Sequence, residues 1–183
     1  MRFEFATAAR IVFGSGTVQQ VAPAARGFGE RALLVTGCPE GLAAEIEAWL
    51  AAAGVRPVRL EVTGEPTVEL VRQGTALARE SGSQVVVAVG GGSAIDAGKA
   101  IAALVANGGD PLDYLEVIGA GRPLRKPSIP WIAVPTTAGT GAEVTRNAVI
   151  ASPQHRVKAS LRSPLMLARL AVVDPDLTLG LPP

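Results

Sequence analysis

Two apolar runs, each followed by a glycine-rich loop, constrain the fold of this chain more than any other feature. Residues 85–89 read VVVAV and precede GGGS at 90–93, and residues 131–134 read WIAV and precede PTTAGTG at 135–141. A strand that is apolar at every position is buried on both faces, which is typical of a parallel sheet covered by helices. A loop without side chains at the end of such a strand lets backbone N–H groups approach an anion. The two runs therefore predict an α/β fold with a ligand site at the carboxyl ends of its strands.

Strand and helix patterns alternate along most of the chain. Strands are predicted at 31–37, 55–62, 84–89 and 129–134, and helices at 17–25, 42–53, 68–81 and 93–106. Pro57, within the second of these strands, predicts that it lies near an edge of the sheet. The alternation predicts a Rossmann-like, mostly parallel sheet with helices on both faces.

The two ends of the chain follow other patterns. Phe3 and Phe5, followed by the apolar residues of 10–14, predict two short strands and hence an N-terminal β-hairpin. Beyond a Gly- and Pro-rich excursion at 107–130, with a short helix at 112–115, strands are predicted at 147–151, 156–161 and 168–173. The length of 183 residues fits one domain, 1–183, better than two.

Charge and cysteine content bound the class of protein. A formal net charge of +1 provides no basic surface for nucleic acid or for an anionic membrane. The single cysteine, Cys38, cannot form an internal disulfide, which favours a reducing compartment. Because residues 1–5 contain no signal-peptide core and no apolar run reaches membrane length, we expect a cytoplasmic protein.

The first glycine loop has several features of an anion site. Ser93 and Asp96 have the spacing of a helix N-terminal capping box, and Lys99, one turn on, can pair with Asp96. The helix start offers unpaired N–H groups and a positive dipole end. The alternative is a tight strand-to-helix turn without a ligand. Ile95 stands where the dinucleotide fingerprint needs its third Gly, so that motif is absent. Ala100 stands where the P-loop needs Ser or Thr, so that motif is absent too.

The second glycine loop is rich in hydroxyl groups. Thr136, Thr137, Thr140 and Thr145 accompany two glycines directly after a predicted strand. Threonine turns that bond their own backbone explain one or two of these residues better than four. Because the carboxyl ends of parallel strands share one edge of the sheet, we expect the two loops to line a single ligand site.

Residues for acid–base or metal chemistry are scarce. His155 is the only histidine and stands among polar residues, so we expect it to be solvated. Asp110, Asp113 and Glu116 are interpreted as an acidic surface turn, and Cys38 as a small loop residue. The sequence has no Gly-x-Ser-x-Gly elbow and no metal-ligand spacing, so it predicts no catalytic residue and no metal ligand in this chain.

Several motifs spread over essentially the whole chain occur together in one family. They are FGSG at 13–16, GEPT at 64–67, GGGS with Asp96 and Lys99, PTTAGTG with Glu143, Val144 and Thr145, and the run from Asp174 to Pro183. In these motifs the chain resembles the iron-containing (group III) alcohol dehydrogenases. The resemblance implies an N-terminal Rossmann-like domain that binds NAD or NADP, in an oxidoreductase that transfers hydride between nicotinamide and an alcohol or aldehyde.

The resemblance also implies which residues bind the cofactor. Those near the pyrophosphate are Gly91, Gly92, Ser93 and Asp96, and those lining the rest of the cofactor are Thr136, Thr137, Thr140, Thr145, Lys158 and Thr178. Lys158 has an independent rationale, because a cation beside a pyrophosphate is favourable. Glu65 stands where many relatives have Asn, and it is left out of the predicted site.

One departure from the family concerns the choice of cofactor. NAD-using relatives often carry Asp after the second strand, where it bonds the adenosine ribose and repels a 2′-phosphate. In this chain that position is Gly37. The resemblance therefore implies a cofactor site at Gly37 that tolerates NADP. Glycine supplies no cation for the 2′-phosphate, so use of both NAD and NADP and a strict preference for NADP are equally compatible with this position.

A second departure concerns the metal. In the family, the ligands of Fe²⁺ or Zn²⁺ lie beyond the Leu-Pro-Pro segment in a helical C-terminal domain, and this chain ends at Pro183. We therefore expect a truncated domain that binds nicotinamide dinucleotide without turnover unless the C-terminal domain or a complementing chain is present. The alternatives are the NAD-binding domain of a dehydroquinate synthase-like lyase and a stand-alone nucleotide-binding module. A stand-alone module predicts a polar outer face, whereas exposed apolar residues near 177–181 would indicate an interface.

Overall fold

The computed structural model describes residues 1–180, and its centre is a six-stranded sheet in which all neighbouring strands are parallel. The strand order is β1-β8-β5-β4-β2-β3. The bounds are β1 (Ile11–Phe13), β2 (Arg31–Gly37), β3 (Arg56–Glu61), β4 (Val85–Gly90), β5 (Trp131–Pro135) and β8 (Leu170–Val173). The predicted Rossmann-like sheet is confirmed, and the strand with Pro57, β3, lies at an edge as predicted.

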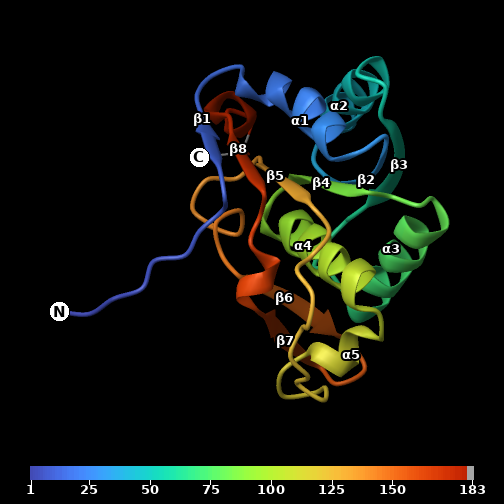
Figure 1. Cartoon of the computed structure of the whole chain (residues 1–183), viewed down its shortest axis with the longest axis vertical. Coiled ribbons are helices and arrows are strands. Elements are labelled where there is room, and N and C mark those ends of the chain that lie inside the picture. Colours follow the sequence, from blue (N-terminus) through green and yellow to red (C-terminus); the bar gives the residue numbers. More distant parts are fainter. Residues whose placement is uncertain (181–183) are drawn as a thin grey trace.

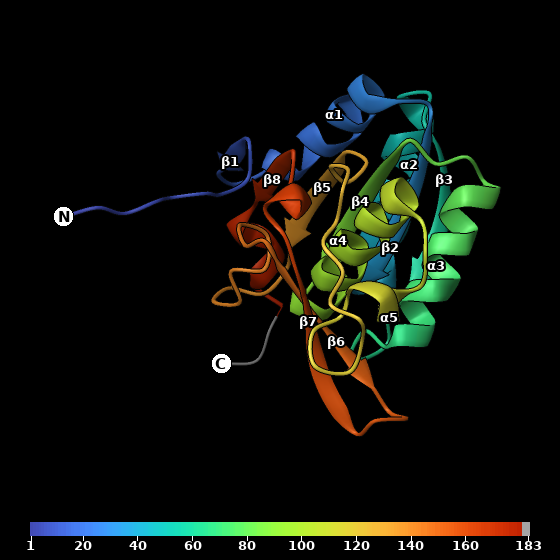
Figure 2. The same ribbon diagram turned by 60° about the horizontal axis from the view of Figure 1, so that its bottom comes forward.

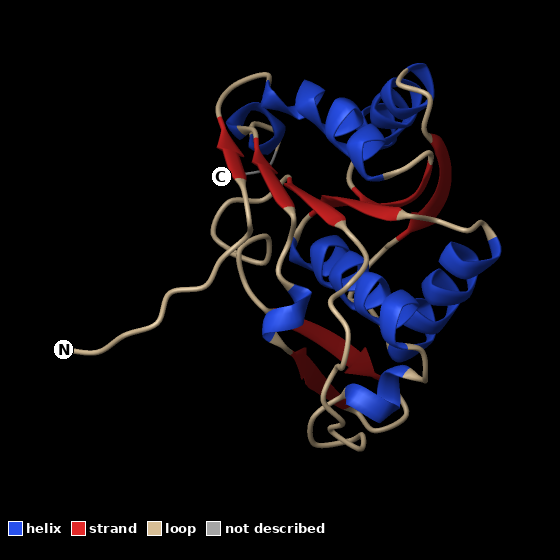
Figure 3. Cartoon of the chain, viewed as in Figure 1, coloured by secondary structure: helices blue, strands red, loops and turns tan. Residues whose placement is uncertain are grey.

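Helices cover both faces of this sheet, as Figure 3 shows. On one face lie α1 (Val21–Phe28) and α2 (Glu40–Ala52), and on the other lie α3 (Val68–Glu80) and α4 (Gly92–Asn107). Successive side chains of a strand point to opposite faces, so neighbours in one strand enter different apolar clusters. In β2, for example, Leu33 joins the cluster that includes α3 and α4, and Leu34 joins the cluster that includes α1 and α2. This double burial explains why the central strands read as continuous apolar runs.

The path of the chain across the sheet reverses between β2 and β4. From β2 the chain passes through α2 to the edge strand β3, and it then returns through α3 to β4, on the other side of β2. The helices that follow β2 and β4 therefore lie on opposite faces of the sheet (Figure 1). Such a reversal opens a crevice at the carboxyl ends of the two strands, which is where ligands bind in open α/β sheets.

An antiparallel hairpin extends the domain on the α3–α4 side. Its strands, β6 (Asn147–Ser152) and β7 (Val157–Arg162), project beyond the sheet, and β6 packs against α4 (Figure 2). The short helix α5 (Pro111–Tyr114) packs against α3. Single 3-10 turns are η1 (Thr17–Gln20), η2 (Pro164–Met166) and η3 (Pro175–Thr178). Within residues 1–180, no helix combines the length and apolar character needed to cross a bilayer.

The N-terminal segment differs from the sequence prediction. Residues 1–10 form no strand, and Phe3 and Phe5 are exposed on an arm that extends away from the domain (Figure 1). Strand β1 pairs in parallel with β8, and the approach to it is held by a hydrogen bond of 2.8 Å from Ala9 N–H to Ala168 O. The predicted N-terminal β-hairpin is wrong because β1 pairs with a strand from the far end of the chain rather than with its neighbour in sequence.

Candidate functional site

The crevice between β2 and β4 is lined by both glycine-rich loops. Gly37 at the end of β2 is paired in register with Gly90 at the end of β4. Beside them lies an open cavity of about 560 Å³. Among its lining residues are six that the sequence predicted for the site: Gly37, Gly91, Gly92, Ser93, Thr136 and Thr137. The loops after β2, β3, β4 and β5 thus meet at one ligand-sized space.

Glycine is required where β2, β4 and α4 meet. A Cβ on Gly90, whose φ is +146°, would lie 2.6 Å from the carbonyl oxygen of Gly37. A Cβ on Gly37 would lie 2.8 Å from the Cβ of Ala94 on α4. The floor of the crevice is therefore bare backbone, because any side chain there would overlap its neighbours. Packing against Ala94 therefore excludes a carboxylate at position 37. Its absence also leaves no negative charge there to repel an anionic ligand.

Helix α4 starts at the wall of this crevice. Its N-cap is Gly91, and no side chain caps it. The predicted capping box of Ser93 and Asp96 is wrong, because the helix begins before Ser93 and the Asp96 carboxylate bonds elsewhere. The first-turn N–H groups and the positive end of the helix dipole are therefore available to an anion in the cavity.

A buried lysine joins this helix to the second loop. The Lys99 side chain has no exposed surface, and its Nζ donates to the carbonyl oxygens of Ala142, at 2.8 Å, and Asn147. The same Nζ donates to Thr145 Oγ1 at 3.2 Å and lies 3.4 Å from a carboxylate oxygen of Asp96. Burial lowers the pKa of Lys99, and the negative charge of Asp96 opposes that shift. The predicted Asp96–Lys99 pair is confirmed, and its ammonium holds α4, the second loop and β6 together.

Asp96 connects the same elements. One carboxylate oxygen accepts a hydrogen bond of 2.9 Å from the N–H of Val149 in β6, and the other faces Lys99. Burial raises the pKa of Asp96, while the Lys99 charge and the Val149 N–H lower it. Asp96 also lines a second cavity of about 170 Å³, together with Ser93 and Lys158. Its carboxylate is thus adjacent to the candidate site and engaged within the protein.

The four threonines of the second loop have different surroundings. Thr136 and Thr137 line the larger cavity. Thr140 packs against the start of α4, with its Cβ 3.5 Å from the point that a Gly92 Cβ would occupy. The Thr145 hydroxyl donates to Ala142 O at 3.3 Å, in addition to its bond from the buried lysine. Two threonines therefore face the ligand space, and at least one stabilises the loop itself.

An ion pair borders the smaller cavity. Lys158 in β7 pairs with Glu65 in the loop between β3 and α3, and 59% and 54% of their side chains, respectively, are exposed. Glu65 lines both cavities of the candidate site, although sequence reasoning left it out of the predicted site. Its position in GEPT, directly after a predicted strand, was the signal that could have placed it there.

Two further residues lie at the same edge of the sheet. Thr178 lines neither cavity, and its hydroxyl donates to Pro175 O at 2.8 Å within η3. Cys38 lines the larger cavity and is half-buried. Burial raises the pKa of the Cys38 thiol, which therefore stays protonated at neutral pH.

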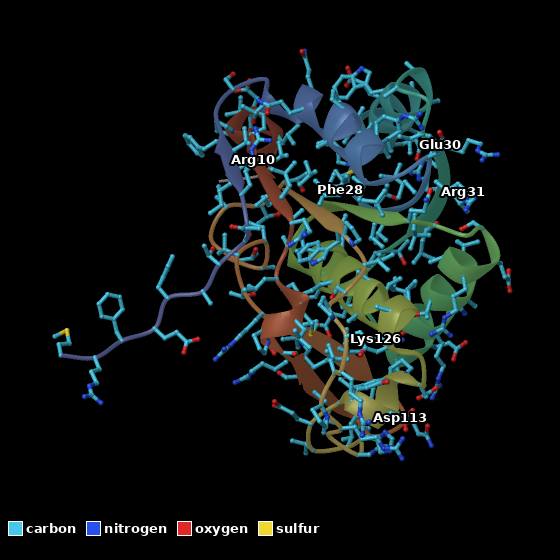
Figure 4. The ribbon with its side chains drawn as sticks, in the orientation of Figure 1. Arg10, Phe28, Glu30, Arg31, Asp113 and Lys126 are labelled. Atoms are coloured by element: carbon cyan, nitrogen blue, oxygen red, sulfur yellow. The ribbon has the colours of Figure 1, made fainter. Side chains whose placement is uncertain are left out.

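The remaining chemical candidates lie away from the crevice. His155 is exposed in the turn between β6 and β7. Asp110 and Asp113 form the capping box of α5, and Asp110 pairs with Arg72 at 2.6 Å, as expected for an acidic surface turn. Figure 4 places Asp113 on α5, and neither Asp113 nor His155 lines either cavity. Among residues 1–180, no three His, Cys, Asp or Glu side chains gather as a metal site requires.

The fold and the crevice define a doubly wound α/β domain with an anion-compatible site at its switch point. The chain belongs to the iron-containing alcohol dehydrogenase family, whose model matches residues 8–175. It is 36% identical to long-chain-alcohol dehydrogenase 1 of Geobacillus thermodenitrificans over 96% of this chain and 46% of that protein. It is 34% identical to sulfoacetaldehyde reductase of Bilophila wadsworthia over 100% of this chain and 48% of that protein.

Solved structures resemble the whole of the described fold. An archaeal halo-thermophilic alcohol dehydrogenase from a Red Sea brine pool has a TM-score of 0.88 and 32% identity, covering 100% of this chain and 49% of that one. Sulfoacetaldehyde reductase from Bifidobacterium kashiwanohense, solved in complex with NAD⁺, has a TM-score of 0.85 and 30% identity, covering 100% and 48%. The chain spans about half the length of these relatives, which are named as dehydrogenases or reductases and not as lyases.

Proposed function

We propose that residues 1–183 form the dinucleotide-binding domain of an NAD(P)-dependent oxidoreductase that transfers hydride between nicotinamide and an alcohol or aldehyde. The observation that carries this proposal is the uncapped start of α4 beside the bare Gly37–Gly90 pair. A pyrophosphate placed there accepts hydrogen bonds from free N–H groups at the positive end of the helix. The NAD⁺ complex of the related sulfoacetaldehyde reductase supports the same class of ligand.

The residues that face the cavities would contact the cofactor directly. Gly91, Gly92 and Ser93 bind the pyrophosphate through the backbone of the helix start, the Ser93 hydroxyl adds a side-chain donor, and Thr136 and Thr137 add hydroxyl groups from the adjoining loop. This division fits the observed geometry, because bare backbone beside hydroxyl groups suits a doubly charged, oxygen-rich ligand.

Other predicted residues would act at the margins of the cofactor. Lys158 supplies a cation at the rim of the smaller cavity, and Gly37 leaves room for the adenosine ribose. Thr178 lies at the outer limit of the site. Asp96 holds β6 against α4. Thr140 contacts the start of α4 and Thr145 bonds Ala142 within the second loop, and both so keep the loop's hydroxyl groups in place.

The described residues do not fit the metal that the family name implies, because no suitable donor cluster occurs in residues 1–180. We propose that metal ligands and a substrate wall belong to a helical C-terminal domain or a complementing chain. Bound nicotinamide supplies the hydride chemistry, and the chain holds and orients it. Of the apolar residues predicted to mark an interface near 177–181, Leu179 is exposed, Leu177 is half-buried against the core, and Leu181 lies outside the described residues. The single cysteine supports a cytoplasmic location.

Calorimetric titration of the 183-residue chain with NADH and with NADPH tests the proposal. Ser93→Ala should weaken binding of both cofactors about fivefold, because it removes a hydroxyl from the site. Ser128→Ala is the matched control, since Ser128 precedes β5 at the amino end of the strands and bonds Leu165 O. Binding that is absent for both cofactors, or weakened equally by the two variants, would contradict the proposal.

A further inference from the structure

We propose that Arg59 on β3 recognises the 2′-phosphate of NADP and that Glu40 on α2 competes for it, so that this ion pair sets the preference between NADP and NAD. The inference rests on the proposed cofactor site. The sequence has no cation close to Gly37, because Arg59 stands 22 positions away along the chain and is brought close only by strand pairing.

The side chain of Arg59 runs along the sheet toward the crevice. In the register of the sheet Arg59 lies opposite Leu34, yet its Nε donates to Thr36 Oγ1 at 3.1 Å, two residues closer to the carboxyl end of β2. Nη1 donates to Glu40 Oε1 at 2.7 Å, and Nη2 donates to Glu40 Oε2. The guanidinium is therefore held between the end of β2 and the first turn of α2.

This position is next to the space proposed for the adenosine ribose. Thr36 directly precedes Gly37, and the next residue, Cys38, lines the larger cavity. Both charges of the ion pair act on Cys38: Arg59 lowers the pKa of its thiol and Glu40 raises it, against the larger effect of burial. The guanidinium and the carboxylate are therefore within electrostatic range of the cavity wall.

Arg59 has the donors that a phosphate needs. Of the five N–H groups of a guanidinium, three are used by Thr36 and Glu40, which leaves two without a protein acceptor in residues 1–180. The Arg59 side chain retains 23% of its exposure, and that of Glu40 retains 73%. Because Glu40 is the more exposed partner, it can yield to a phosphate, which pairs with guanidinium through two parallel hydrogen bonds.

Position 37 carries no carboxylate that would repel a 2′-phosphate. With no negative charge on the floor of the crevice, the carboxylate that competes directly for the Arg59 guanidinium is that of Glu40, and Glu65, which lines the cavity, is paired with Lys158. Each of these carboxylates is thus matched by a cation, which admits both cofactors. Removal of Arg59 should therefore weaken NADPH binding, and removal of Glu40 should strengthen it.

Titration of three variants with NADPH, NADH, 2′,5′-ADP and 5′-ADP tests this inference. Arg59→Gln should weaken the binding of NADPH and of 2′,5′-ADP about tenfold, because one charge-assisted contact to the 2′-phosphate is lost. The affinities for NADH and 5′-ADP should change less than about twofold. Glu40→Gln should tighten NADPH about threefold by freeing the guanidinium. Arg72→Gln is the matched control, because it breaks an arginine–carboxylate pair of the same type between α3 and α5.

The outcomes separate the two proposals. An unchanged ratio of NADPH to NADH affinity in Arg59→Gln would overturn this inference while leaving the cofactor site intact. Equal weakening of all four ligands would also overturn it, because the role of Arg59 would then be structural, and the unfolding temperature relative to Arg72→Gln would reveal this. Failure of the unaltered chain to bind either NADH or NADPH would overturn the proposed function itself.

Discussion

The two glycine-rich loops form adjoining walls of one crevice, and they are shaped by different forces. The first loop, residues 90–93, owes its shape to backbone geometry, because side chains at Gly90 would overlap Gly37. The second loop, residues 135–145, is fixed by a single buried ammonium, that of Lys99, which bonds carbonyl and hydroxyl oxygens along it. The first wall therefore depends on the lack of a side chain at Gly90, and the second wall depends on the charge of Lys99. The difference predicts that substitutions will harm the two walls to different extents.

The largest effect is expected from Lys99→Met. It leaves Asp96 without its cation and two buried carbonyl groups without a donor, which should lower the free energy of unfolding by about 3–5 kcal/mol. Urea denaturation measures this. Lys126→Met, at an exposed site, should change stability by less than about 0.5 kcal/mol. A Lys99→Met effect as small as that of the control would show that the charge does not hold the second wall.

Gly90→Ala should be the next most harmful change, at the first wall. The strained φ of +146° and the contact of 2.6 Å with Gly37 O should together lower the free energy of unfolding by about 1–3 kcal/mol. Gly92→Ala is the matched control, because its Cβ would meet Thr140 at an ordinary 3.5 Å, and its stability should be nearly unchanged. Equal stability of the two variants would mean that the first loop tolerates side chains.

Thr145→Val tests a smaller contribution to the second wall. It removes the hydroxyl that accepts from Lys99 and donates to Ala142 O, at an expected cost of about 0.5–1.5 kcal/mol in unfolding free energy. Thr137→Val, in the same loop but facing the cavity, should leave stability unchanged and weaken NADH binding instead. The opposite pattern, with Thr145 acting only on the cofactor, would assign its hydroxyl to the ligand.

The smallest effect is a pH dependence carried by Asp96. Because burial raises the folded-state pKa of Asp96 above 3.8, its stabilising contribution is greatest at acid pH and is lost as pH rises through the folded value. The unfolding free energy of the unaltered chain, minus that of Asp96→Asn, should therefore fall as pH rises above 3.8. A difference that rises with pH would show that Lys99 and Val149 outweigh burial and that the pKa of Asp96 is lowered.

Most of the sheet could be predicted from the sequence because its strands are buried on both faces. The pattern predicted a helix at 68–81 and a strand at 84–89, and the structure has Val68–Glu80 and Val85–Gly90. The N-terminal hairpin failed because alternation specifies that a strand exists and not which strand it joins. The partner of β1 lies about 160 residues away along the chain, and the local sequence does not specify that pairing.

The candidate site was predictable where it depends on residue type and not where it depends on distant contacts. The glycines and threonines after the apolar runs indicated the crevice. The spacing of Asp96 and Lys99 predicted their pairing, but not that Lys99 would be fully buried, because that burial requires β6 to return to α4. Arg59 was missed for the same reason, since it reaches the site through the pairing of β3 with β2. Glu65 was left out because of the comparison with Asn in relatives, although its position after a predicted strand indicated the site.

The close approach of Gly37 to Ala94 restricts how this sequence can evolve. A side chain at position 37 needs the space now taken by the methyl group of Ala94, so the two positions are expected to covary among close homologues. Loss of that methyl alone weakens the helix by about 1 kcal/mol, and a carboxylate at position 37 alone overlaps it. Either order of substitution passes through a less stable protein. A lineage that carries this pair is therefore expected to keep Gly37 unless both positions change together.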